Sequence, residues 1–326
     1  MFSHNKIRKK KGVLFTIIAI SLLALSLFYI SYSYSYHKRM GTIAISSRID
    51  SMNNFVKDVE KDLRRELYIS SFRTLLGLEE YIASQGRFLN NTEESFREVF
   101  LFGKLGNESI SIMENTTFVN WTEKVRRRAL ELMINVNITL NNISINQSDP
   151  WSVEVSINTS VFIQDLNNLA SWNKTILKTV KVSIIGFEDP LYVVNSYGKI
   201  TNVINRTPYT YFVLNNNTEN LLNHLNNSYY IESTTAPSFL MRFSNNLSSS
   251  PQGIESLVNL NEFVSKGIPI ETKSVVDYIY FSNRTTTDLC VDNSVADPDL
   301  PSWFRLDTDD NHHIIYEITT INKTCS

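Results

Sequence analysis

An uncharged run of 24 residues, Val13 through Tyr36, constrains this chain more than any other feature of its sequence. At about 1.5 Å per residue a helix over this run is roughly 36 Å long, which is enough to cross a hydrocarbon layer of ~30 Å with some tilt. A helix in a soluble core would not remain apolar on every face over that length. We therefore expect a transmembrane helix over residues 13–36.

The charges beside this run predict its orientation. Five basic residues precede it, whereas His37, Lys38 and Arg39 follow it. Basic residues stay on the cytoplasmic side, so we expect residues 1–12 to be a cytoplasmic stub and the bulk of the chain to be extracytoplasmic at the cell membrane. Such a stub is too short for an intracellular signalling domain. A cleaved signal peptide is the alternative, and only Ser33 and Ser35 offer small residues for its cleavage site.

Glycosylation signals support an outer location for the rest of the chain. Fifteen Asn-x-Ser/Thr sequons occur, whereas 35 Asn and 62 Ser or Thr among 326 residues predict roughly 7 by chance. Such sites are typical of secreted surfaces. An Asn-rich composition without attached glycans is the alternative interpretation. The candidate sites are Asn90, Asn107, Asn115, Asn120, Asn137, Asn142, Asn146, Asn158, Asn173, Asn205, Asn216, Asn226, Asn246, Asn283 and Asn322.

Cysteine content and charge agree with this location. The only two cysteines, Cys290 and Cys325, both follow the apolar run, and an even pair in an oxidising compartment predicts one disulfide. A reduced, buried pair is the alternative. Residues 37–326 contain 26 basic and 33 acidic residues, a net charge of −7. Because nucleic-acid-binding domains normally present a basic face, no nucleic-acid partner is expected. The basic cluster Arg126–Arg128 is interpreted as solvated surface.

The segment Lys10-Lys11-Gly12, followed at once by Val13, resembles the processing site of type IV pilin-like precursors. In that family a basic leader ends in glycine and the apolar helix begins directly after it. The resemblance implies cleavage between Gly12 and Val13 and a role as a filament subunit. One position departs from the family pattern, since Ile17 stands where pilin-like helices usually have glutamate.

Residues 37–86 are expected to continue as one long juxtamembrane helix. Apolar residues recur at alternating spacings of four and three, which is typical of a coiled-coil seam or of a helix packed on one surface. We expect this helix to pack on the chain's own sheet, and Gly86 to end it. The apolar positions are Ile45, Ile49, Met52, Val56, Val59 and Leu63.

Residues 87–190 are expected to form an antiparallel sheet with one solvated face. A helix over 121–133 comes first, with Val125, Leu132 and Met133 as its buried stripe. Apolar and polar residues then alternate over 134–141, over 151–163 and around 180–184, which predicts three half-buried strands. Residues 191–326 contain short apolar runs between polar stretches and are interpreted as a β-rich C-terminal region, either a separate domain or an extension of the sheet.

No catalytic, metal or cofactor motif is found, so no enzymatic activity and no cofactor are expected. Asp307, Asp309 and Asn311 have the spacing of a calcium loop, but His312 and Ile318 replace its required Gly and Glu. This segment is interpreted as a polar hairpin turn. Because neighbouring residues of a strand point to opposite faces, a zinc site at His312 and His313 is not expected either. A glycosidase built from acids remote in sequence is the residual alternative.

The fold class expected is therefore α+β: an N-terminal transmembrane helix running into a long amphipathic helix, then an extracytoplasmic region with antiparallel sheet. As a whole the chain resembles the sequon-rich, membrane-anchored surface proteins of archaea. That resemblance implies a non-catalytic surface, adhesion or binding role, with the lipid bilayer, surface proteins or a second copy of the chain as partners.

Overall fold

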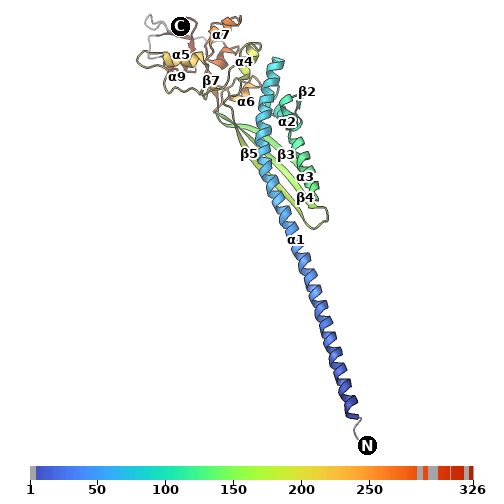
Figure 1. Cartoon of the computed structure of the whole chain (residues 1–326). Helices are drawn as coiled ribbons and strands as arrows, with labels where there is room; N and C mark the ends of the chain where they lie inside the picture. Colours follow the sequence, from blue (N-terminus) through green and yellow to red (C-terminus); the bar gives the residue numbers. More distant parts are fainter. Residues whose placement is uncertain (1–4, 285–288, 293–299, 309, 319–322, 326) are drawn as a thin grey trace.

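One helix dominates the computed structural model, which describes residues 5–284, 289–292, 300–308, 310–318 and 323–325. Helix α1 (Asn5–Gln85) runs without a break for 81 residues, and its N-terminal half projects from the rest of the molecule (Figure 1). It is long and apolar enough to cross a membrane, and its most apolar part buries no side chain. The predicted stop is confirmed, because Gly86 adopts φ +62°, a conformation that favours glycine.

Three strands form the central antiparallel sheet: β3 (Ile134–Asp149), β4 (Ser152–Asp165) and β5 (Ser171–Ser183), in the order β3-β4-β5. The predicted alternation is confirmed in β4, where Val153, Val155 and Ile157 are buried between half-exposed polar residues. In β3 a register shift lies between Leu140 and Asn142. After it, the residues that face the core are at odd instead of even positions. Such a bulge turns Ile143 toward the core.

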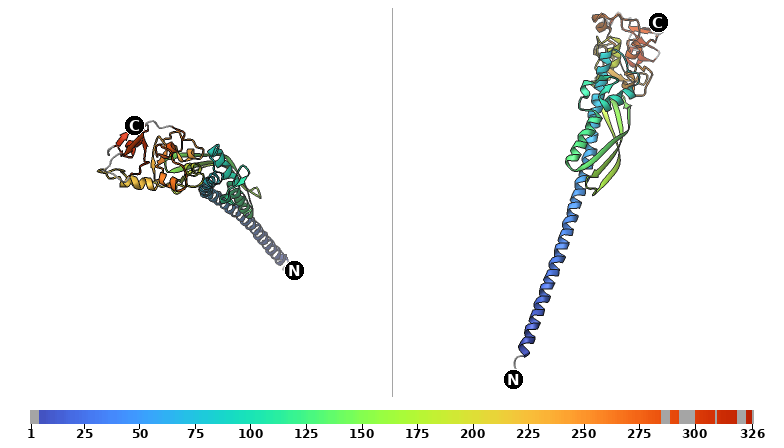
Figure 2. Two further views of the ribbon diagram at one scale, coloured as in Figure 1. Left: turned by 90° about the horizontal axis from the view of Figure 1, so that it is seen from above. Right: turned by 90° about the vertical axis from the view of Figure 1, so that its right-hand side faces the viewer.

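The C-terminal half of α1 covers the inner face of this sheet, as predicted (Figure 2). Its buried stripe begins with Met52, Val56, Val59, Leu63 and Leu67 and continues to Ile82. The earlier members of the same stripe, Ile45 and Ile49, remain exposed. The helix therefore passes from an exposed shaft into a buried core element near residue 50. We call the part of the chain described beyond this point the head.

Short elements connect α1 to the sheet: α2 (Thr92–Phe102), β1 (Lys104–Leu105), β2 (Glu108–Ser109), η1 (Ser111–Met113) and α3 (Phe118–Glu131). Val125 of α3 is buried as predicted, but Leu132 and Met133 are exposed, so that part of the prediction is wrong. The helix ends at Glu131, and Met133 adopts φ +56° in the turn before β3. Residues beyond the helix end no longer follow its periodicity, and so they leave its buried face.

The C-terminal region differs from the expected β-rich region. Its strands have two to four residues, and helices of four to eight residues lie between them. Short apolar runs do not distinguish a strand from a buried helical turn, which explains the wrong assignment. The elements are α4 (Pro190–Asn195), α5 (Glu219–Asn226), β6 (Tyr230–Glu232), α6 (Phe239–Arg242), β7 (Ile254–Ser256), α7 (Leu260–Ser265), α8 (Asp277–Tyr280), β8 (Leu289–Asp292), β9 (Leu306–Asp307), α9 (His312–Ile315) and β10 (Lys323–Cys325).

This region shares a hydrophobic core with α1 and the sheet. The ring of Phe187 packs edge-on against Phe72 of α1, with centroids 5.3 Å apart, and against Phe239 of α6 at 5.8 Å. The backbone amide of Leu89 donates a hydrogen bond of 2.8 Å to the carbonyl of Phe243. A second core cluster lies entirely within the C-terminal region and the loop before α2. The C-terminal region is thus built onto the end of α1 and the sheet.

Candidate functional site

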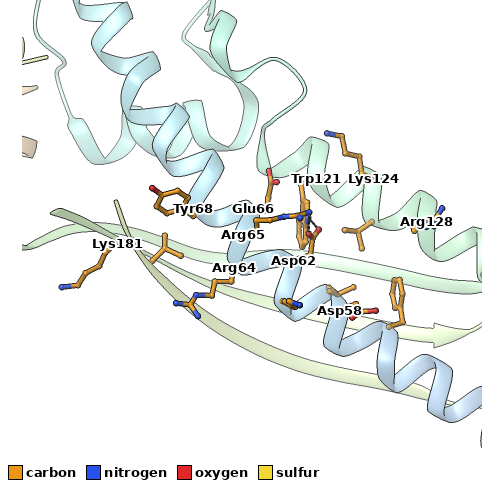
Figure 3. A pocket seen from close by; sticks show the side chains of 15 residues that line it. Asp58, Asp62, Arg64, Arg65, Glu66, Tyr68, Trp121, Lys124, Arg128 and Lys181 are labelled. Carbon is orange, nitrogen blue, oxygen red and sulfur yellow. Dashed lines mark hydrogen bonds and ion pairs between the residues drawn. The ribbon is translucent and has the colours of Figure 1, made fainter. Parts of the chain in front are cut away.

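A depression of about 930 Å³ follows the exposed side of α1 where the helix crosses the sheet. We call it the α1 groove. It lies between α3 on one flank and β5 on the other, with Val59, Val125 and Val180 buried at its base (Figure 3). The lining residues are Phe55, Asp58, Val59, Lys61, Asp62, Arg64, Arg65, Glu66, Tyr68, Trp121, Lys124, Val125, Arg128, Val180 and Lys181.

Asp62 fixes the α3 flank of the groove. One carboxylate oxygen accepts a hydrogen bond of 2.8 Å from the indole nitrogen of Trp121, and the other pairs with the guanidinium of Arg65 at 2.6 Å. Figure 3 shows these three side chains meeting between α1 and α3. Since the ring of Trp121 is buried, this contact holds the two helices at a fixed separation.

The groove is basic. Lys61, Arg64 and Tyr68 are exposed on the outer side of α1, and no ion pair of Lys61 or Arg64 is formed among the described residues. Burial raises the pKa of Glu66, and the hydrogen bond from Ser70 and the charge of Lys124 oppose that shift only in part.

The groove is not apparent from the sequence. Its basic residues come from three segments, and only Arg128 belongs to the predicted Arg126–Arg128 cluster. The interpretation of that cluster as surface agrees with exposed ion pairs from Arg126 to Glu123 and from Arg128 to Glu131. The periodic charges of α1 were a weak signal, because an exposed helix face is normally charged.

A second cluster of charged residues lies inside the C-terminal region. Arg242 is fully buried, and its guanidinium donates to Asp189 at 2.5 Å and to Asp277 at 2.8 Å. The hydroxyl of Tyr230 donates to Asp189 at 2.8 Å, and that of Ser256 to Asp277 at 2.9 Å. Burial raises the pKa of Asp277, while the charge of Arg242 opposes the shift. These hydrogen bonds join the five side chains into a buried ion network with no solvent-exposed member, although the Nε of Arg242 has no hydrogen-bond partner in it.

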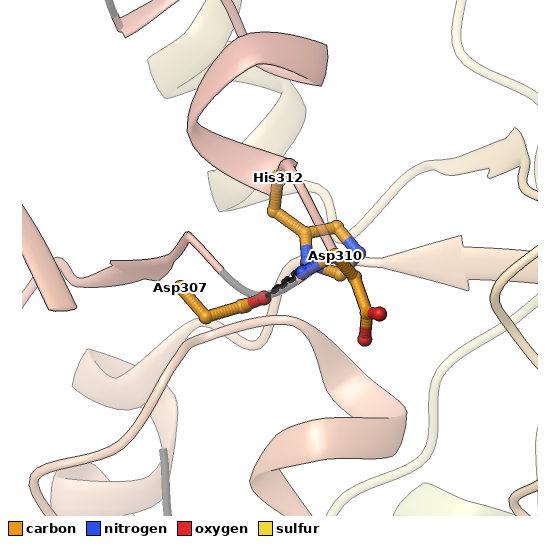
Figure 4. Close-up of side chains that lie close together, drawn as sticks. All are labelled: Asp307, Asp310 and His312. Carbon is orange, nitrogen blue, oxygen red and sulfur yellow. Dashed lines mark hydrogen bonds and ion pairs between the residues drawn. The ribbon is translucent and has the colours of Figure 1, made fainter. Parts of the chain in front are cut away.

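His312 extends this network. Its Nδ1 lies 2.7 Å from Asp307 (Figure 4). Its Nε2 lies 3.3 Å from Glu255. Burial would lower the pKa of His312, but the hydrogen bonds to the two carboxylates raise it to about 10. The imidazole is therefore a cation at neutral pH. The same partnership lowers the pKa of Asp307 against the effect of its burial.

The predicted hairpin turn at this segment is wrong. Asp307 ends β9 and His312 begins the short helix α9, so His312 turns into the core. Asp307, Asp310 and His312 each place one ligand atom within 4.8 Å of the others. Asp310, however, pairs with Arg284 at 2.8 Å, and the Nδ1 of His312 is already held by Asp307 at 2.7 Å, so these ligand atoms have partners within the protein. The arrangement is a structural ion network. Asp309 lies outside the described residues.

Glu79 gives the head a testable pH dependence. Burial raises the pKa of Glu79 to about 9, and the nearby charges of Glu188 and Asp189 add to the shift. Between pH 4.5 and 9 the folded protein keeps a proton that the unfolded chain releases, so stability falls as pH rises, by at most about 1.4 kcal/mol per pH unit. The variant Glu79→Gln should lose this dependence. We expect it to be more stable than the wild type at pH 8 by about 1 kcal/mol or more, and similar to it at pH 5.

Urea unfolding of both proteins at pH 5 and pH 8 measures this difference. Glu80→Gln, on the neighbouring position of the same helix, is the matched control and should follow the wild type. Equal slopes of stability against pH for Glu79→Gln and the wild type would show that Glu79 is ionised in the folded state.

The sequon asparagines lie on the surface. Of the fourteen that the structure describes, Asn120 and Asn158 are half-buried and the other twelve are exposed. Asn322 lies outside the described residues. Cys290 and Cys325 are direct partners in the register of β8 and β10. The structure describes the backbone of these two residues but not their side chains, so the disulfide stays a prediction.

Comparisons with known proteins identify no relative of this chain. No protein-family model, no curated protein sequence and no solved structure matches this chain.

Proposed function

We propose that this protein is a single-pass, membrane-anchored surface glycoprotein that displays the head outside the cell for a non-catalytic binding role. One observation carries the proposal: α1 is a single helix whose first half exposes its apolar side chains while its second half forms the core of the head. An apolar helix of this length is stable in a bilayer, where its backbone groups are satisfied internally. The rigid continuation would hold the head away from the membrane.

The surface positions of the sequons favour glycosylation, and the register of the cysteine pair favours a disulfide. In antiparallel strands, directly opposite residues have Cα atoms about 4.5–5.5 Å apart, which suits a disulfide. Both modifications belong to an extracytoplasmic location. The two buried groups around Arg242 and His312 have no access to solvent, so neither offers a surface on which a substrate could react.

A second candidate function, a pilin-like filament subunit, is favoured by the part of α1 just beyond the expected membrane span. Met40, Ile43, Ile45 and Ile49 are exposed there, with Ile43 63% accessible. Apolar side chains in water favour contact with another apolar surface. In a filament, the same segments of neighbouring copies would cover one another after cleavage between Gly12 and Val13.

The N-terminal peptide of the membrane-extracted protein, identified by mass spectrometry, separates these functions. A start at Met1 supports the retained anchor, and a start at Val13 supports the filament subunit. A start beyond Ser35 contradicts both, because the apolar run would then be a removed signal peptide. Protease treatment of intact cells is the companion measurement. We expect digestion of the head and protection of residues 13–36, and protection of the head would contradict an outer location.

A further inference from the structure

The α1 groove differs in charge from the rest of the outer chain. It is lined by six basic and three acidic side chains, a net charge of +3, whereas residues 37–326 together have a net charge of −7. Several of the basic groups form surface ion pairs, such as Lys181 with Asp149. Exposed pairs of this kind are worth little and exchange readily for a ligand. Lys61 and Arg64 have no ion-pair partner among the described residues and are immediately available.

The shape of the groove suits an elongated ligand. From Asp58 to Tyr68 the helix advances about 15 Å, with basic residues at successive turns. A parallel basic row, Lys124 and Arg128, follows α3. The volume of about 930 Å³ lies within the range of about 300–1,000 Å³ that small-molecule sites occupy. A ligand with negative groups at intervals along its length would match this row.

The remaining lining groups narrow the chemistry of this ligand. The carboxylates of Asp58 and Glu66 can accept hydrogen bonds from hydroxyl groups but would repel a ligand made only of phosphates. Tyr68 is 45% accessible, and its ring offers an apolar face beside these polar groups. Hydroxyls, acidic groups and apolar ring faces occur together in acidic sugars. A nucleic-acid duplex fits less well, because it would meet the acidic surface that surrounds the groove.

We propose that the α1 groove binds a linear acidic polysaccharide, a chain of sugars that carry carboxylate or sulfate groups. Lys61 and Arg64 pair with the acidic groups, Asp58 accepts hydrogen bonds from sugar hydroxyls, and Tyr68 packs against a ring face. The inference rests on the proposed function and deepens it by naming the class of ligand that the displayed head would bind.

The test uses the full chain in detergent, with polygalacturonate and dextran sulfate as acidic probes, and dextran and duplex DNA as comparisons. We expect the wild type to bind one or both acidic polysaccharides and not dextran. The double variant Lys61→Gln, Arg64→Gln should weaken binding about tenfold or more. The matched double variant Arg97→Gln, Lys266→Gln changes the net charge equally at exposed sites away from the groove, and should stay within twofold of the wild type.

A third variant separates sugar recognition from attraction between charges. Tyr68→Ala leaves the net charge unchanged and should still weaken polysaccharide binding several-fold. Equal losses in both double variants, an unchanged Tyr68→Ala, or no binding of either acidic probe would overturn the proposal. Duplex DNA binding that is tighter and depends on the same lysine and arginine would overturn it in favour of a nucleic-acid site.

Protease treatment of intact cells tests surface display separately from ligand binding. If the head is digested but neither acidic probe binds, the ligand assignment is wrong and surface display stands. If the head is protected from protease, surface display is wrong, whatever the purified protein binds.

Discussion

Replacing Arg242 with methionine is expected to lower the free energy of unfolding of the head by about 3–5 kcal/mol, which is the cost of breaking a buried ion pair by removing one partner. The substitution leaves Asp189 and Asp277 fully buried without the cation that pairs with both. It also removes the donor that satisfies the backbone carbonyl of Ile254. Urea unfolding of the full chain in detergent, followed by tryptophan fluorescence, measures the change.

The control variant removes the two negative charges as well, so that no charge at this site is left without a partner. A triple variant that combines Arg242→Met with Asp189→Asn and Asp277→Asn contains no unpaired charge at this site, and we expect it to recover a large part of the loss. Asparagine keeps the shape and most of the hydrogen-bonding groups of aspartate. A loss below about 1 kcal/mol for the single variant would mean that water reaches the two carboxylates and that the network is not closed.

The second large effect is expected for Leu63→Ala, at the contact between α1 and the sheet. Leu63 is completely buried in the stripe that joins the helix to β4 and β5. Truncating a buried leucine removes its transfer free energy and leaves a cavity, at a cost of about 2–5 kcal/mol. Because the same helix is the core element of the head, we also expect faster hydrogen exchange of β4 and β5 amides.

Ile69→Ala is the matched control on the same helix. Its side chain is 37% accessible, so its loss should cost less than about 1.5 kcal/mol and leave the exchange of the sheet unchanged. If Leu63→Ala and Ile69→Ala were equally destabilising, the packing of α1 on the sheet would be looser than the burial of Leu63 implies.

The sequence by itself predicted the elements whose periodicity is local. The long helix and the packing of Val56, Val59 and Leu63 on the sheet follow from spacings of three and four residues. The stop at Gly86 follows from the glycine itself, which favours the conformation that ends a helix. The three strands follow from alternation, because a strand with one solvated face repeats every two residues. The prediction lost accuracy where an element ends, as at Met133, since periodicity does not mark its own boundary.

The groove and the buried ion network arise only from the tertiary structure. Lys61, Lys124 and Lys181 come from three elements that pack together, and no local spacing relates them. Arg242 pairs with acids 53 and 35 residues away. His312 was expected on a turn, but a short helix turns it toward Glu255, which is 57 residues away along the chain. A local pattern records which face of a segment is buried. Which charged groups meet on burial depends on the packing of distant segments, and that is decided only when the chain folds.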